Sequence, residues 1–73
     1  MSVQRERLSE LREIRKARHL SLEAVAYLAD CDAATISRIE NGQVQPRRET
    51  VVRIAQALGV SVGRIAPSQE AAL

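Results

Sequence analysis

The segment from Ser21 to Gly42, SLEAVAYLADCDAATISRIENG, constrains the fold of this chain more than any other stretch. It predicts two short helices joined by a tight corner. Ser21 is a good N-cap for the first helix, and Leu20 and Val25 have the spacing of a hydrophobic staple. Asp32 is a second N-cap candidate, after the helical pattern is interrupted at 29–31. Gly42 ends the second helix, because glycine readily adopts the left-handed conformation found at helix ends.

Aliphatic side chains at helical spacing indicate which faces of these two helices point inward. Ala26 is small enough to let another helix cross closely. The inward residues are expected to be Val25, Leu28 and Ala29 in the first helix, and Ile36 and Ile39 in the second.

Further helices are predicted on both sides of this segment. Residues 1–18 carry an apolar stripe of Leu8, Leu11 and Ile14, and ion pairing of Arg12 and Lys16 with neighbouring glutamates is expected to contribute little. A polar loop containing Pro46 precedes a helix from about Glu49 to Leu58, which Gly59 ends and whose wide apolar arc predicts more than one packing partner. Ser61 is expected to cap a short fifth helix that Pro67 ends. The prediction is an all-α, compact five-helix bundle: one domain over 1–66, with 67–73 as a frayed tail.

Composition supports one small domain whose core is aliphatic. The chain has 73 residues, 45% of them hydrophobic and one of them aromatic. Its net charge is only +2, so the placement of basic residues matters more than their sum. A single cysteine excludes an internal disulfide and a thiolate-rich metal site. No apolar run is long enough for a membrane helix and no signal-peptide pattern opens the chain, so we expect a cytoplasmic protein with no membrane partner.

The segment resembles the helix-turn-helix of the phage repressor, Cro and XRE-type regulators. The resemblance covers roughly Leu8 to Ile65. Its matching residues are Ala26, Asp30, Cys31 and 35–42 (TISRIENG), then Pro46 and 49–61 (ETVVRIAQALGVS). The resemblance implies a lambda-repressor-like DNA-binding domain: a transcriptional repressor or controller that binds palindromic double-stranded DNA as a homodimer.

In such a motif the second helix enters the major groove, where base edges display distinct donor and acceptor patterns. Arg38 is the expected reader of a base, because its guanidinium suits the O6 and N7 atoms of guanine. Small and polar residues complete the expected base-reading set: Ala33, Ala34, Thr35 and Ser37. The residues expected to bind phosphates follow this helix: Asn41, Gln43, Gln45, Arg47 and Arg48.

The chain departs from the family pattern at four positions. Leu22 replaces a common glutamine and is interpreted as core. Asp30 replaces a frequent glycine, but aspartate tolerates the left-handed conformation. Asp32 brings a negative charge near the phosphates; it either caps its helix, the favoured reading, or accepts a hydrogen bond from cytosine. Arg48 stands where the family often has an apolar residue.

A salt bridge is predicted between Arg15 and Glu40. Arg15 falls on the same side of its helix as the apolar stripe, and a guanidinium turned toward a core needs a partner. Glu40 lies close to the inner face of the second helix, and the family resemblance implies the same pair. The alternative is that both side chains reach solvent.

Val60, Val62 and Ile65 are the candidate dimer interface. The alternative is that they close the core of the monomer, and some of them could do both.

Three other residues could have either a functional or a structural role. Cys31 is interpreted as a small buried residue at the corner rather than a redox sensor. His19 is expected to cap a helix end rather than bind metal, and Tyr27 to be a partly exposed packing residue. No catalytic arrangement is evident, so we expect neither enzyme activity nor any cofactor or metal. The alternative function is a helical protein-interaction module that has kept the fold but lost DNA binding, which Asp32, Ala33 and Ala34 favour.

Overall fold

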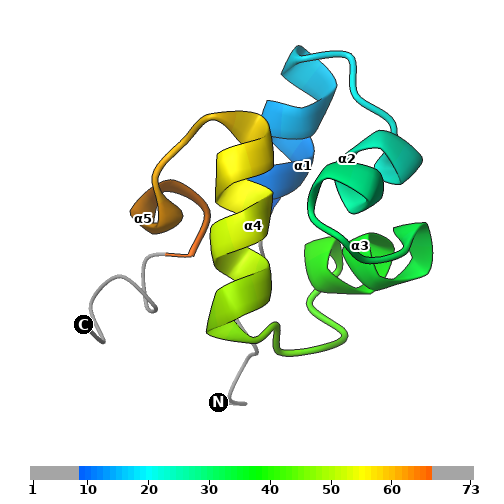
Figure 1. Cartoon of the computed structure of the whole chain (residues 1–73), viewed down its shortest axis with the longest axis vertical. Coiled ribbons are helices and arrows are strands. Elements are labelled where there is room, and N and C mark those ends of the chain that lie inside the picture. Colours follow the sequence, from blue (N-terminus) through cyan, green and yellow to red (C-terminus); the bar gives the residue numbers. More distant parts are fainter. Residues whose placement is uncertain (1–8, 67–73) are drawn as a thin grey trace.

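The computed structural model describes residues 9–66 and contains five helices in that range (Figure 1). They are α1 (Ser9–Ala17), α2 (Leu22–Leu28), α3 (Ala33–Glu40), α4 (Arg48–Leu58) and α5 (Val62–Ile65). The prediction of an all-helical, five-helix fold is therefore confirmed for the described residues. The expectations for residues 1–8, which include Leu8, and for the tail at 67–73 lie outside them.

The N-caps predicted for α2 and α3 are both formed. Ser21 Oγ accepts a hydrogen bond from the backbone N–H of Ala24 at 3.0 Å, and Asp32 Oδ1 accepts one from the N–H of Thr35 at 2.8 Å. Each bond satisfies a backbone donor that has no partner within its own helix. Ser61 occupies the N-cap position of α5, as expected, but its side chain makes no capping hydrogen bond.

Four helices end in the same way, with one residue in the left-handed conformation. At these positions φ is 57° (His19), 61° (Asp30), 72° (Gly42) and 73° (Gly59). At each end the next N–H bonds to a carbonyl five residues earlier, as Cys31 does to Ala26 at 2.9 Å. This is the Schellman arrangement, which satisfies carbonyls left open at a helix end. The predictions for Asp30, Gly42 and Gly59 are confirmed, whereas the conformation of His19 was not predicted.

An aliphatic core lies between the helices. It consists of Leu11, Ile14, Val25, Ala26, Ala29, Ile36, Ile39, Val51, Ile54, Ala55, Leu58, Ile65 and Ala66. Leu20, Leu22, Cys31, Val44, Val60 and Val62 are partly buried against it. Leu22 therefore packs against the core, as predicted, although its side chain is only partly buried. Cys31 is also half-buried rather than fully buried.

Two side chains of α2 lie on its outer surface. Leu28 is 54% exposed and Tyr27 is 85% exposed. The assignment of Leu28 to the inner face is wrong, because Val25, Ala26 and Ala29 form that face and Leu28, two residues after Ala26, points away from it. Tyr27 is correspondingly more exposed than a packing residue.

Helix α4 packs against both α2 and α5, as its wide apolar arc predicted, and it begins one residue earlier than expected, at Arg48. Helix α5 also packs against α1, where Arg64 Nε lies 3.2 Å from Glu10 Oε1. These contacts place α5 and α3 on opposite sides of α4 (Figure 1). The outer side of α3 is therefore left clear of the other described helices.

Candidate nucleic-acid interface

Helix α3 is buried along one side and open along the other. Ile36, Ile39 and Glu40 are buried, and they hold the helix against α2 and α1. Ala34, Arg38 and Asn41 are exposed on the outer side, while Ala33, Thr35 and Ser37 are half-buried. The residues predicted to read bases therefore lie on the outer and flanking sides of α3, although three of them have limited exposure.

The loop after α3 carries the residues predicted to bind phosphates. Gln43, Gln45 and Arg47 are exposed in the loop, and Arg48 is exposed at the start of α4. Together with Asn41 at the C-cap of α3, they give the segment after this helix a series of exposed polar and basic side chains, which alternate with the half-buried Gly42, Val44 and Pro46. Amide and guanidinium groups are common donors to phosphate oxygens.

Asp32 acts as a helix cap at the start of this surface. Hydrogen bonds from the side chain and the backbone N–H of Thr35 hold the pKa of Asp32 below its usual value. Its carboxylate is therefore ionised at neutral pH and is engaged in capping. Asp32 therefore caps α3, which is the role that the sequence favoured for it.

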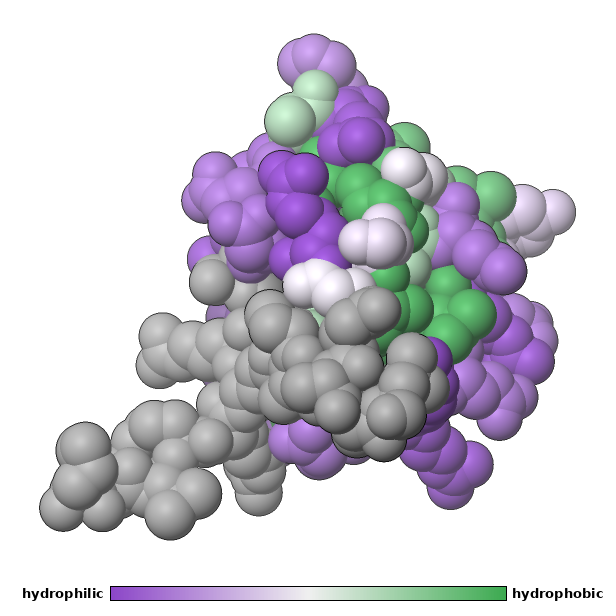
Figure 2. All heavy atoms as spheres, turned by 90° about the vertical axis from the view of Figure 1, so that its left-hand side faces the viewer, coloured by the Kyte–Doolittle hydropathy of each residue, from purple (hydrophilic) through white to green (hydrophobic). Residues whose placement is uncertain are grey.

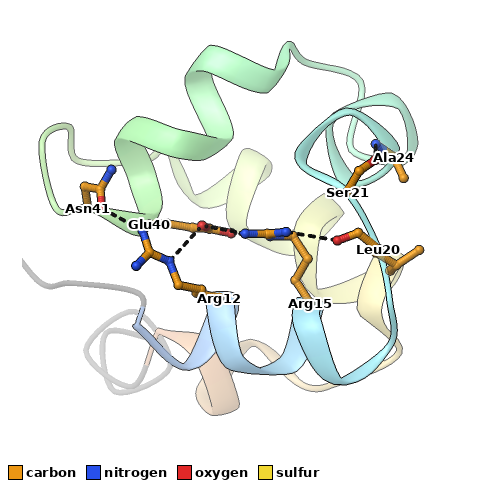
Figure 3. A network of polar contacts seen from close by, with 7 residues as sticks. All are labelled: Arg12, Arg15, Leu20, Ser21, Ala24, Glu40 and Asn41. Atoms are coloured by element: carbon orange, nitrogen blue, oxygen red, sulfur yellow. Dashed lines mark hydrogen bonds and ion pairs between the residues drawn. The ribbon is translucent and has the colours of Figure 1, made fainter.

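A salt bridge ties the last turn of α3 to α1, as predicted from the sequence (Figure 3). Arg15 Nε lies 2.7 Å from Glu40 Oε2, and Arg15 Nη2 lies 3.2 Å from Glu40 Oε1. The Glu40 side chain is 1% exposed and that of Arg15 is 11% exposed. The hydrogen bond that Arg15 donates to the Glu40 carboxylate raises the pKa of Arg15 above its ordinary value, so the guanidinium remains charged. Arg15 Nη1 also donates to the carbonyl of Leu20 at 2.9 Å, which fixes the loop before α2.

Arg12 is a member of this network that was missed from the sequence. Its Nε lies 3.4 Å from Glu40 Oε1, and its Nη2 donates to Asn41 Oδ1 at 2.9 Å (Figure 3). Arg12 was expected to pair with neighbouring glutamates; in the part of the chain that the structure describes, its ion pair is with Glu40 of α3. A usable signal was present, because Arg12 lies three residues before Arg15 and shares its helix face.

Of the three residues of the candidate dimer interface, two keep some exposed surface that a second copy could contact and one is buried. The side of the molecule that carries α5 shows apolar surface among polar residues (Figure 2). Val60 and Val62 are half-buried, at the entry to α5 and at its start. Ile65 is 1% exposed and packs in the core of its own chain, so the assignment of Ile65 to the interface is not supported.

The fold and this surface define a helix-turn-helix domain: α2, a tight corner, and a second helix held from behind with its polar side exposed. The chain belongs to this family, since residues 9–67 match the family model described as a helix-turn-helix domain.

Relatives in this family are described as regulators. The chain is 40% identical over 52 residues to the uncharacterized HTH-type transcriptional regulator RghRB of Bacillus subtilis (strain 168). This match covers 70% of the chain but 37% of RghRB, so the chain spans much less than the whole of that relative.

Two solved structures share the fold. The restriction-modification controller protein C.AhdI from Aeromonas hydrophila is 29% identical, with a TM-score of 0.77 over 80% of this chain and 88% of that one. The clp gene regulator ClgR from C. glutamicum has a TM-score of 0.78 over 100% and 96% of the two chains, and at 23% identity it shows the shared fold alone. In the part of the chain that the structure describes, no helix has the length and apolar character needed to cross a membrane.

Proposed function

We propose that the chain binds double-stranded DNA in a sequence-specific manner by inserting the outer side of α3 into the major groove. The observation that carries the proposal is the pinning of α3 by Ile36, Ile39 and Glu40, which leaves Arg38 and Ala34 exposed on its other side. A helix of this size fits the major groove of B-DNA.

In the proposed complex, Arg38 donates to the O6 and N7 atoms of a guanine. Ala33, Ala34 and the methyl group of Thr35 offer apolar contact to thymine methyl groups, and Ser37 donates to a base or a phosphate. The residues after α3, from Asn41 to Arg48, bind the phosphates and set the register of docking.

We further propose that two copies bind a palindromic operator and act as a repressor or controller. The relation to C.AhdI, described as a controller protein, supports this proposal. Val60 and Val62, half-buried on the side that carries α5, are the proposed contacts between the copies. The site of action is then the cytoplasm, at the nucleoid.

Selection from random duplexes tests this function. The wild-type chain should enrich a two-fold symmetric sequence whose half-sites lie about one helical turn apart. Arg38→Ala should lose about 1–3 kcal/mol on that sequence and should relax the preference at one base pair of each half-site. Enrichment of no sequence, or an equal loss for Arg38→Ala on every duplex, contradicts specific readout by α3.

A second candidate is a protein-interaction module that has lost DNA binding. The exposed Tyr27 and Leu28 on α2 favour it, because large apolar side chains on a surface mark contact sites more often than polar ones. A salt titration separates the two functions. Several phosphate contacts predict an affinity that falls steeply with the logarithm of salt concentration, whereas apolar partner binding would change little.

A further inference from the structure

Arg12 reaches the end of α3 from another helix. Its guanidinium contacts the carboxylate of Glu40 through Nε and the side-chain oxygen of Asn41 through Nη2. The Arg12 side chain remains 44% exposed, in contrast to the nearly buried Arg15. Arg12 therefore lies at the boundary between the buried salt bridge and the polar surface that follows α3 (Figure 3).

The chemistry of arginine fixes which end of the Asn41 amide faces Arg12. A guanidinium carries N–H donors and no acceptor, so Asn41 must present its oxygen to it. The NH₂ group of Asn41 then points away from Arg12. Asn41 is exposed at the C-cap of α3, beside the outer side of this helix, so its amide group lies at the edge of the proposed DNA surface.

We propose that Arg12 is a positioning residue for DNA binding. It holds Asn41 so that the amide NH₂ donates to a phosphate oxygen beside the end of α3. This inference rests on the proposed DNA-binding function and adds a residue to it. The Arg12 guanidinium itself binds protein acceptors, and its effect on DNA is exerted through Asn41.

The surrounding contacts make this role separable from stability. Glu40 keeps both contacts with Arg15 when Arg12 is replaced, so its buried carboxylate is not left without a partner. Arg12→Met is therefore expected to fold, and its melting temperature is checked beside each binding measurement. Arg53→Met is the matched control, because the Arg53 side chain on α4 is 43% exposed, close to the 44% of Arg12, and lies in neither the proposed DNA surface nor α5.

The test is a double-mutant cycle on the duplex selected by the wild-type chain. Arg12→Met and Asn41→Ala should each weaken binding about tenfold, and the double variant should weaken it by no more than the stronger single variant. Arg53→Met should bind like the wild type. Losses that multiply in the double variant overturn the inference while leaving the proposed function standing. Failure of the wild-type chain to bind any duplex overturns the proposed function and this inference with it.

Two further readouts separate positioning from direct contact. Asn41→Asp keeps an oxygen for Arg12 but replaces the NH₂ donors with a carboxylate oxygen, so it should retain the melting temperature and bind DNA more weakly than Asn41→Ala. Wild-type affinity of Asn41→Asp overturns the inference. Arg12→Met should leave the salt slope close to that of Arg53→Met; a slope lower by about one phosphate contact than in this control assigns Arg12 a direct contact and overturns positioning.

Discussion

Arg15 and Glu40 join α1 to the last turn of α3 through two hydrogen bonds, of 2.7 and 3.2 Å between the guanidinium and the carboxylate. Both side chains are almost withdrawn from water, so each depends on the other for its charge to be tolerated. The pair fixes the end of the helix that carries the proposed base-reading surface.

Glu40→Ala should lower the free energy of unfolding by about 3–5 kcal/mol, because it leaves Arg15 buried without its carboxylate. Glu49→Ala is the control: it removes the exposed pair with Arg53 in α4 and should cost about 0.5 kcal/mol or less. Urea denaturation of both variants measures the difference. An unchanged midpoint for Glu40→Ala contradicts the assignment of the pair as a stabilising contact.

The cap made by Asp32 predicts a dependence of stability on pH. Hydrogen bonds from Thr35 lower the pKa of Asp32 in the folded chain, so the folded state favours the ionised carboxylate. The stabilisation is fully present above the pKa of the unfolded chain and is lost as the pH falls through the lowered, folded pKa. The advantage of the wild type over Asp32→Asn should therefore shrink as the pH falls below about 5 and through the lowered pKa of Asp32.

Ser21→Ala is the control for this pH series, because the cap that it removes from α2 has no titrating atom. Its cost should be the same at both ends of the pH range. An advantage of the wild type over Asp32→Asn that stays constant with pH would show that the ionised form gives no stabilisation.

Cys31 should react slowly as a nucleophile at neutral pH. Burial, with further contributions from Asp32 and Asp30, raises the pKa of the Cys31 thiol above its ordinary value. The reactive thiolate is therefore scarcer than in an unfolded chain. The rate of alkylation by iodoacetamide, measured against pH, should rise at a higher pH in the folded chain than in the denatured chain. Equal or faster reaction of the folded chain near neutral pH would favour a reactive cysteine instead.

Val62→Glu should shift the chain from dimer to monomer in sedimentation equilibrium, because it places a charge on the proposed interface at α5. Val44→Glu is the matched control: Val44 is another partly buried valine, in the loop between α3 and α4. Both variants are first shown to melt cooperatively. A Val62→Glu chain with the wild-type association constant would remove α5 from the proposed interface.

Much of the fold was predictable because local signals agreed with tertiary packing. Ser21 and Asp32 are strong capping residues, and Ile36 and Ile39 have the helical spacing that places both on the buried side of α3. The end of α1 was not predictable in the same way. His19 adopts the left-handed conformation there, at a position where glycine or asparagine would be the expected residue.

The error at Leu28, and the choice left open at Ile65 between the dimer interface and the monomer core, both arise because an apolar pattern does not show what covers a side chain. The spacing of apolar residues shows that a helix has an apolar face, but not which of several apolar residues face the core. In α2 the smaller residues Val25 and Ala26 are buried, and the larger Leu28 is not. Ile65 looked available for a partner because only the structure shows that α1 and α4 already cover it. Arg12 was not predicted as a partner of Glu40 although it shares a helix face with Arg15, because the sequence separation of 28 and 29 residues hides both of its contacts.

Nuclear magnetic resonance of the labelled chain, titrated with its selected duplex, tests the central claim most directly. The largest backbone shifts should fall on α3 and the loop after it, at Ala34, Arg38, Asn41 and Gln43, with side-chain amide shifts at Asn41. Shifts confined to Tyr27 and Leu28 on α2, or to α5, would contradict the claim that the outer side of α3 is the surface that binds DNA.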